Sequence, residues 1–200
     1  MKIQKILMLV CVFTLCTALC NVLPIHGEEK IYESVLRLHV LANSDSDEDQ
    51  ALKLKVRDEI LSYVSPRVID ATSREEAQQI LQNELENIEK IAAQTVAREG
   101  YDYSVDVTLT VEEYPTRNYE AMSFPSGEYI SLRVLIGEAE GQNWWCVLYP
   151  ELCTSTAHAG ETLIKTGFSK DQIDILTGGE KPQYRLKFKI LEFFQQGICE

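Results

Sequence analysis

The feature that most constrains the fold is a strict alternation of apolar and polar residues from Tyr101 to Glu112. The apolar members are Tyr101, Tyr103, Val105, Val107, Leu109 and Val111, and a polar or acidic residue follows each of them. Because successive side chains of a strand point to opposite faces, this segment predicts a strand with one face packed and the other toward water. Such strands are typical of antiparallel sheets.

Other segments also have the pattern of strands. Residues 35–41 alternate Leu36, Leu38 and Val40 with Arg37 and His39, which predicts a half-buried strand with His39 at the surface. Residues 128–136 and 143–149 read as two strands joined by the short loop 137–142, which favours a hairpin. Residues 114–123 read as an irregular link and residues 124–127 as a tight turn. Residues 184–190 alternate as a final strand, although residues 186–194 also fit a helical stripe.

Two long helices are predicted between the first strand and the alternating segment. Ser46 and Asp49 have the spacing of a capping box, and we expect that helix to close at Pro66. The second begins at Ser73 and ends before Gly100. Residues 159–166 and 169–176 predict short helices. The fold class is therefore α+β, a mainly antiparallel sheet with its helices largely on one face.

The N-terminal segment predicts the compartment. Lys2 and Lys5 precede a run without charge from Ile6 to Leu23, and Gly27 provides a small residue before Glu28. This pattern is typical of a signal peptide or a membrane anchor over residues 1–27. We therefore expect residues 28–200 to form a single exported domain, secreted or anchored by the N-terminal segment, with the cleavage of that segment left open.

The charge of the chain argues against one class of partner. The formal net charge is −12, with 31 acidic and 19 basic residues. Such a surface repels phosphate backbones, so we expect no nucleic-acid partner.

The cysteines outside the apolar run are Cys146, Cys153 and Cys199. Export permits a disulfide between Cys146 and Cys153 with Cys199 as a spare thiol, but two reduced, buried cysteines fit the spacing equally well. Adding His158 gives three potential zinc ligands, but the spacing of the two cysteines lies outside the usual range of structural zinc sites. We predict no metal and no other cofactor.

No stretch of the chain matches a catalytic signature. The oxygen-rich segment 43–49 lacks the glycine and glutamate of an EF-hand loop, so its acids are interpreted as helix caps. A small exported hydrolase that uses carboxylates or Cys153 remains the alternative from the enzyme class.

Trp144 and Trp145 are the strongest candidates for contact with a partner. Neighbouring residues of a strand face opposite sides, so only one of the two indoles can enter a core on a given face. Because Trp is enriched at binding hot spots, these two residues, together with Phe124 and Tyr129, indicate a surface for contact with a partner. The alternative is that helices cover both faces of that strand.

Several blocks of the sequence resemble a known family. They are residues 37–58 (RLHVLANSDSDEDQALKLKVRD), 124–129 (FPSGEY), 132–137 (LRVLIG) and 141–153 (GQNWWCVLYPELC). Together they resemble the stage II sporulation protein R family from about Val35 to Phe194.

This resemblance implies a signalling role without catalysis. Members of the family are exported from the forespore into the space between the two membranes that separate it from the mother cell. There they activate a membrane-embedded protease, the sigma-E factor processing peptidase, which removes the pro-sequence of sigma-E. The partner expected here is that peptidase, with membrane contact only through residues 6–23 if they are uncleaved. Besides the hydrolase, an envelope structural module remains an alternative.

Overall fold

The computed structural model describes residues 28–119, 122–153 and 159–177, together with Gln4, Met8 and residues 10–12. The elements in chain order are α2 (Glu28–Ser34), β1 (Leu36–Leu41), α3 (Asp47–Val68), α4 (Arg74–Arg98), β2 (Val105–Tyr114), β3 (Arg117–Tyr119), β4 (Met122–Phe124), β5 (Gly127–Ile136), β6 (Asn143–Tyr149), α5 (Ala159–Lys165) and α6 (Lys170–Thr177). The α+β class is as predicted. Among the described residues, no helix combines the length and the apolar character needed to span a membrane. Most of the segment 1–27, the strand predicted for 184–190, His158 and Cys199 lie outside the described residues.

The main sheet has the strand order β2-β5-β1-β6, and it is mixed rather than purely antiparallel. Strands β2 and β6 pair antiparallel with their neighbours, whereas β1 and β5 run parallel with Leu38 opposite Leu132. A parallel pair requires a long crossover, and the crossover here contains both long helices. The main sheet is therefore mixed, with antiparallel pairing at two of its three strand contacts, so the expectation of a mainly antiparallel sheet holds in part.

The predicted hairpin between β5 and β6 is wrong, because β1 lies between these two strands. The connecting loop crosses the end of β1 and hydrogen-bonds to it. The backbone N–H of Glu140 donates to the Asn43 carbonyl at 3.2 Å, and that of Gly141 donates to the Ala42 carbonyl at 3.0 Å. A short loop can thus skip one strand when the end of that strand supplies its hydrogen-bond partners.

Both long helices begin at the predicted caps. The Ser46 side chain accepts a hydrogen bond from the Asp49 backbone N–H, and Ser73 does the same for Glu76. Helix α3 does not close at Pro66, however, but continues to Val68. Val68 is only 1% exposed, and its burial in the core favours the continuation past the proline.

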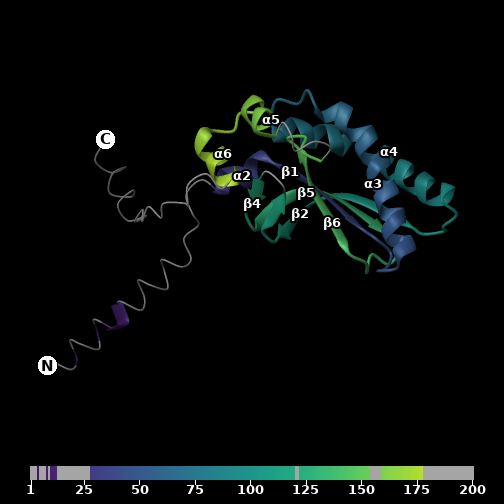
Figure 1. Ribbon diagram of the computed structural model, residues 1–200, viewed down its shortest axis with the longest axis horizontal. Coiled ribbons are helices and arrows are strands. Elements are labelled where there is room, and N and C mark those ends of the chain that lie inside the picture. Colours follow the sequence, from purple (N-terminus) through teal and green to yellow (C-terminus); the bar gives the residue numbers. More distant parts are fainter. Residues whose placement is uncertain are drawn as a thin grey trace.

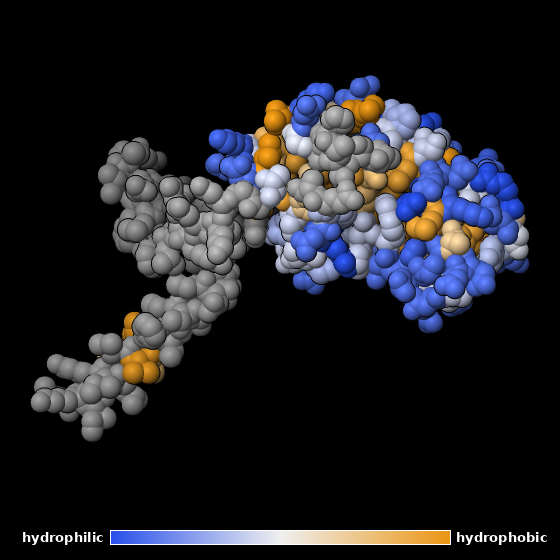
Figure 2. Space-filling model, in the orientation of Figure 1, coloured by the Kyte–Doolittle hydropathy of each residue, from blue (hydrophilic) through white to orange (hydrophobic). Residues whose placement is uncertain are grey.

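The two faces of the sheet have different coverings (Figure 1). Helices α3 and α4 lie against one face, where they enclose a core with Leu38, Val107 and Leu132. The surface around these helices is largely hydrophilic (Figure 2). We call the opposite side of the sheet the outer face. A second core that includes residues of α2, α5, α6 and β4 covers one end of it. The short helices therefore depart from the expectation that the helices lie largely on one face.

The segment between β2 and β5 is more ordered than predicted. Residues 114–123, expected to be an irregular link, contain strand β3 and the first residues of β4, which pair antiparallel with Arg117 opposite Phe124. Phe124 and Tyr119 contact each other edge to face, with ring centroids 6.0 Å apart. This small hairpin brings Arg117 and Tyr119 to the outer face.

Candidate docking face

A row of side chains crosses the outer face at its less covered end. Strand register aligns Thr108 of β2 with Arg133 of β5, Arg133 with His39 of β1, and His39 with Trp145 of β6. Thr108, Arg133 and Trp145 are half-buried, and the His39 side chain retains a small exposed fraction. The row therefore presents polar and aromatic groups at the surface of an otherwise apolar sheet.

Arg37 lies two residues before His39 on β1 and on the same face, and it is fully buried. Its guanidinium carbon lies 4.5 Å from the ring centroid of Tyr114, 4.9 Å from that of Tyr129 and 5.3 Å from that of Phe124. It donates one hydrogen bond from Nη2 to the Tyr119 hydroxyl at 3.2 Å, and its Nε and Nη1 atoms have no hydrogen-bond partner. The faces of the three rings supply the negative potential that a carboxylate would usually provide.

His39 is buried rather than at the surface, which corrects the sequence-based expectation. Its Nδ1 lies 3.1 Å from Glu112 Oε1, and its Nε2 lies 2.7 Å from Asn143 Oδ1. Both partners are side-chain oxygen atoms, so the imidazole is held between β2 and β6. Burial acts to raise the pKa of Glu112, but hydrogen bonds from His39 and Ser131 and the charges of His39 and Arg133 outweigh it, so the pKa is lowered.

Trp145 and Trp144 lie on opposite faces of β6. The Trp145 ring is stacked under the Arg117 guanidinium at 3.4 Å and lies 5.4 Å from the His39 ring, both on the outer face. Trp144 packs against the core beneath α3, where Arg57 lies 4.8 Å from its ring. Trp145 is thus the one of the two candidates that lies on the outer face, and its role in contact with a partner stays a prediction.

Phe124 and Tyr129, the other two candidates for partner contact, lie in the second core. Phe124 is 0% exposed and Tyr129 is 1% exposed. Their rings pack against Arg37 and leave no surface for a partner. These two candidates are therefore corrected: their aromatic character serves the burial of Arg37.

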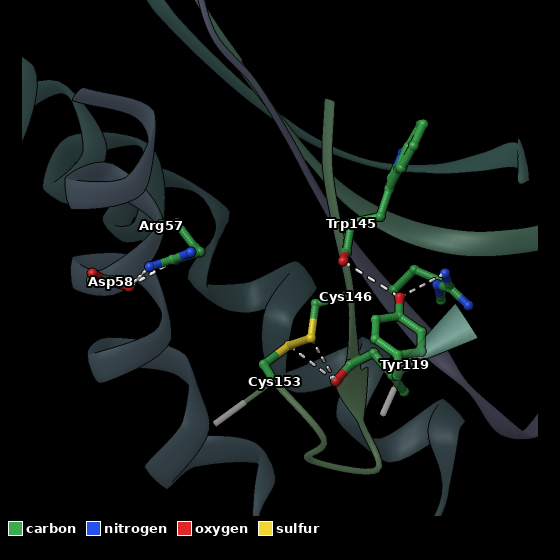
Figure 3. The surroundings of a disulfide bond; sticks show 8 residues. Arg57, Asp58, Tyr119, Trp145, Cys146 and Cys153 are labelled. Carbon is green, nitrogen blue, oxygen red and sulfur yellow. Dashed lines mark hydrogen bonds and ion pairs between the residues drawn. A yellow bond between two sulfur atoms is a disulfide. The ribbon is translucent and has the colours of Figure 1, made fainter. Parts of the chain in front are cut away.

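The structure joins Cys146 and Cys153 in a disulfide, with their Cα atoms 5.6 Å apart. Figure 3 shows the disulfide on the side of β6 that faces Arg57 and Asp58, with the Trp145 side chain pointing elsewhere. A disulfide-bonded sulfur is not a thiolate, so Cys153 in this state cannot act as the nucleophile considered for a hydrolase. Among the described residues, no three His, Cys, Asp or Glu side chains are grouped so that they could hold a metal ion.

The disulfide leads to a prediction about stability. The double substitution Cys146→Ala with Cys153→Ala is expected to lower the free energy of unfolding by ~2 kcal/mol, because the closed loop restricts the unfolded chain. Urea unfolding of the oxidised and the dithiothreitol-treated protein measures this difference. Reduction should destabilise the unmodified chain to the same extent and leave the variant unchanged. Equal stability of the oxidised and reduced unmodified chain would contradict the assignment.

The acidic segment 43–49 forms a latch rather than a cation loop. The Asp49 carboxylate is 4% exposed and accepts hydrogen bonds from Ser44 Oγ at 2.6 Å and from Asn43 Nδ2 at 2.8 Å. Asn43 Oδ1 in turn accepts from the backbone N–H of Glu138 at 3.0 Å. Part of the acidic sequence therefore holds β1, α3 and the β5–β6 loop together, while Asp47 and Glu48 are exposed in the first turn of the helix.

Sequence reasoning missed most of the outer face. Arg37 and His39 alternate with apolar residues, which predicted a solvated side of β1, and no local signal shows that two strands flank β1. Arg117 was missed because its segment was interpreted as irregular. The alternation did contain a usable signal: a strand with Arg and His at alternate positions places both on one face, next to whatever the neighbouring strands contribute.

Comparison with known proteins gives two matches. The family model described as "Stage II sporulation protein R" matches residues 32–159, which include every described strand. The stage II sporulation protein R of Bacillus subtilis (strain 168) is 40% identical over 133 residues, which are 66% of this chain and 59% of the relative. The chain thus spans less than two thirds of the length of that curated relative. No solved structure matches the chain.

Proposed function

This chain belongs to the stage II sporulation protein R family, a family of sporulation proteins, and on that premise we propose that it acts as an exported developmental signal. It docks onto a membrane-embedded protease, the sigma-E factor processing peptidase, and switches that protease on. The protease then removes the pro-sequence of sigma-E. The observation that carries this proposal is the family match across residues 32–159.

The outer face supports a role in docking. It presents Trp145 and Arg133 on the main sheet and Arg117 on strand β3 over it, and Trp and Arg are among the residue types enriched at binding hot spots. On the described part of the outer face, His39 and Glu112 are hydrogen-bonded to each other. A ligand that acts by contact needs a presented surface of this kind and no chemistry of its own.

Export also has support from two parts of the chain. The charge-free run from Ile6 to Leu23 follows two lysines, as in a signal peptide or an anchor. Disulfides persist in compartments outside the reducing cytosol, and the Cys146–Cys153 bond fits such a compartment.

A co-expression experiment tests the proposed function. The full chain, the membrane protease and the sigma-E precursor are produced together in a bacterium that does not sporulate, and precursor cleavage is followed by immunoblot. Cleavage is expected with the unmodified chain and not with Val12→Arg combined with Leu15→Arg, because two charges in the apolar run block translocation. If the precursor stays intact although all three proteins accumulate, the chain is not an activator. Equal cleavage with the translocation-blocked variant would contradict action from outside the cytosol.

The two tryptophans provide a matched pair for the same assay. Trp145→Ala is expected to reduce precursor cleavage on the order of tenfold, since loss of a hot-spot side chain costs about 2 kcal/mol or more of binding energy. Trp144→Ala, on the helix side of β6, is expected to lower the melting temperature while the remaining folded protein still activates. Unchanged cleavage with Trp145→Ala would remove Trp145 from the contact surface.

A further inference from the structure

The outer face carries more unpartnered polar groups than the rest of the described chain. The buried side-chain nitrogen and oxygen atoms without a hydrogen-bond partner are Arg37 Nε, Arg37 Nη1, Ser65 Oγ, Thr108 Oγ1, Arg117 Nε and Arg133 Nε. All of them except Ser65 Oγ belong to residues on or over the outer face. Arg37 is enclosed by aromatic rings and is out of reach of a ligand. Because a buried donor without a partner is costly, the remaining atoms, on Thr108, Arg117 and Arg133, point to a ligand that supplies the missing acceptors.

The charges of this face oppose those of the whole molecule. The chain has a net charge of −12, yet the described part of the outer face carries Arg37, Arg117 and Arg133 against the acids Asp106 and Glu112. Glu112 lies 3.1 Å from His39 Nδ1 and 3.9 Å from Arg133 Nη1, so it is hydrogen-bonded to the imidazole and is only a distant partner of Arg133. The guanidinium groups of Arg117 and Arg133 therefore have capacity left for a further anion.

We propose that the outer face binds a short acidic peptide segment of its partner, with carboxylates placed against the Arg117 and Arg133 guanidinium groups. This inference rests on the proposed function, because it names the chemistry by which the receptor protease is recognised. Guanidinium groups match carboxylates with paired hydrogen bonds. Arg117 is stacked on Trp145, which leaves the edge of its planar group available for such a pair.

The spacing of the two cations suits a peptide. Arg133 on β5 and Trp145 beneath Arg117 on β6 are separated by β1, which places them about 10 Å apart at the usual strand spacing. An extended segment carries side chains of residues i and i+2 on one side at a separation of ~7 Å, within reach of two long arginines. A nucleic-acid duplex or an anionic lipid surface would bring many further anions close to the acidic residues that surround the outer face. The resulting repulsion disfavours both of these partners.

The first experiment uses charge reversal in the co-expression assay. Arg117→Glu with Arg133→Glu is expected to reduce precursor cleavage at least about tenfold, since like charges then face each other at the contact. The matched control is Lys55→Glu with Lys90→Glu, an equal change of charge at exposed positions of α3 and α4 on the other side of the sheet, and cleavage should equal that of the unmodified chain. Arg117→Gln with Arg133→Gln removes both positive charges without adding negative ones. Its result therefore does not depend on any misfolding that the new glutamates cause. Full cleavage with both arginine variants would overturn the inference while leaving the proposed function intact.

The second experiment does not depend on the protease. The chain contains two tryptophans, so full-length protein labelled with 5-fluorotryptophan in detergent gives two fluorine signals. An N-acetylated, C-amidated pentapeptide of alternating glutamate and serine is expected to shift the Trp145 signal saturably and to leave the Trp144 signal in place. The glutamine variant should bind at least about tenfold more weakly, and the lysine version of the peptide should have no effect.

The remaining arms of this titration distinguish other anions. Inorganic phosphate and phosphatidylglycerol added as mixed micelles with the same detergent are expected to shift the Trp145 signal less than the peptide does at equal anion concentration. A stronger response to either of them would overturn the assignment to a peptide. A response of both tryptophan signals together, or of neither, would also overturn it.

Discussion

Replacing Arg37 with glutamate is expected to lower the free energy of unfolding by ~3–5 kcal/mol, the usual cost of an uncompensated buried charge. The three rings of Tyr114, Phe124 and Tyr129 turn toward the guanidinium. An aromatic face is negative, so a carboxylate in the same place is repelled where the cation is attracted. Since domains of this kind are stable by about 5–15 kcal/mol, this single change removes a large share of the total.

Replacing Arg37 with methionine instead separates the effect of the charge on stability from the effect of the side-chain volume. Arg37→Met keeps an unbranched side chain among the rings and removes a cation that has only one hydrogen bond, to Tyr119. We expect its stability to lie within ~1.5 kcal/mol of the unmodified chain, because volume-conserving replacements are tolerated. Urea unfolding followed by circular dichroism measures both variants. A glutamate variant as stable as the methionine variant would show that the rings do not surround this side chain.

Replacing Asp49 with alanine is expected to cost ~3 kcal/mol of stability, because Ser44 and Asn43 then lose a charged acceptor in a buried latch. The exposed Asp47, in the same first turn, is the matched control, and Asp47→Ala should cost less than ~1 kcal/mol. Equal losses of stability in the two variants would show that Asp49 stabilises the protein only as a negative charge near the helix N-terminus, and not through its hydrogen bonds with Ser44 and Asn43.

The same carboxylate predicts a pH dependence. Burial acts to raise the pKa of Asp49, but hydrogen bonds from Ser44, Asn43, Tyr103 and Ser46 outweigh it and hold the pKa below its ordinary value of 3.8. A lowered pKa contributes stability that is present above 3.8 and is lost as the pH falls below that value toward the pKa of the folded state. The gap in unfolding free energy between the unmodified chain and Asp49→Asn should therefore stay constant from neutral pH to about pH 5 and shrink below about pH 4. A gap that persists to about pH 2 would rule out this linkage.

Local sequence patterns were sufficient to predict most of the helices and strands. The alternation in β2, the serine caps of α3 and α4, and the turn residues around β5 act between neighbours in sequence, so the sequence alone reveals them. Strand order depends instead on which edges pair across the chain, and periodicity carries no information on it. That is why β1 was expected to have a solvated side, although the rings of Tyr114, Phe124 and Tyr129 enclose Arg37 there.

In the candidate site too, local patterns predicted some residues, whereas the positions of others depend on contacts between distant parts of the chain. Trp145 was identified because two adjacent tryptophans cannot share one face, an argument that needs only the geometry of a strand. Phe124 and Tyr129 were misassigned because their burial depends on the hairpin β3–β4 and on helix α2, which local sequence did not place. Arg117 and Arg133 become neighbours of Trp145 and His39 only through the strand register and the chain reversal at β3.

Photocrosslinking tests most directly the claim that this protein acts by docking through its outer face. A photoreactive amino acid is placed at Thr110, half-buried on the outer face, or at Gln82, exposed on helix α4, in the full chain produced with the membrane protease. We expect a crosslink to the protease from Thr110 and none from Gln82. A crosslink from Gln82 alone would place the contact on the helical side and contradict it.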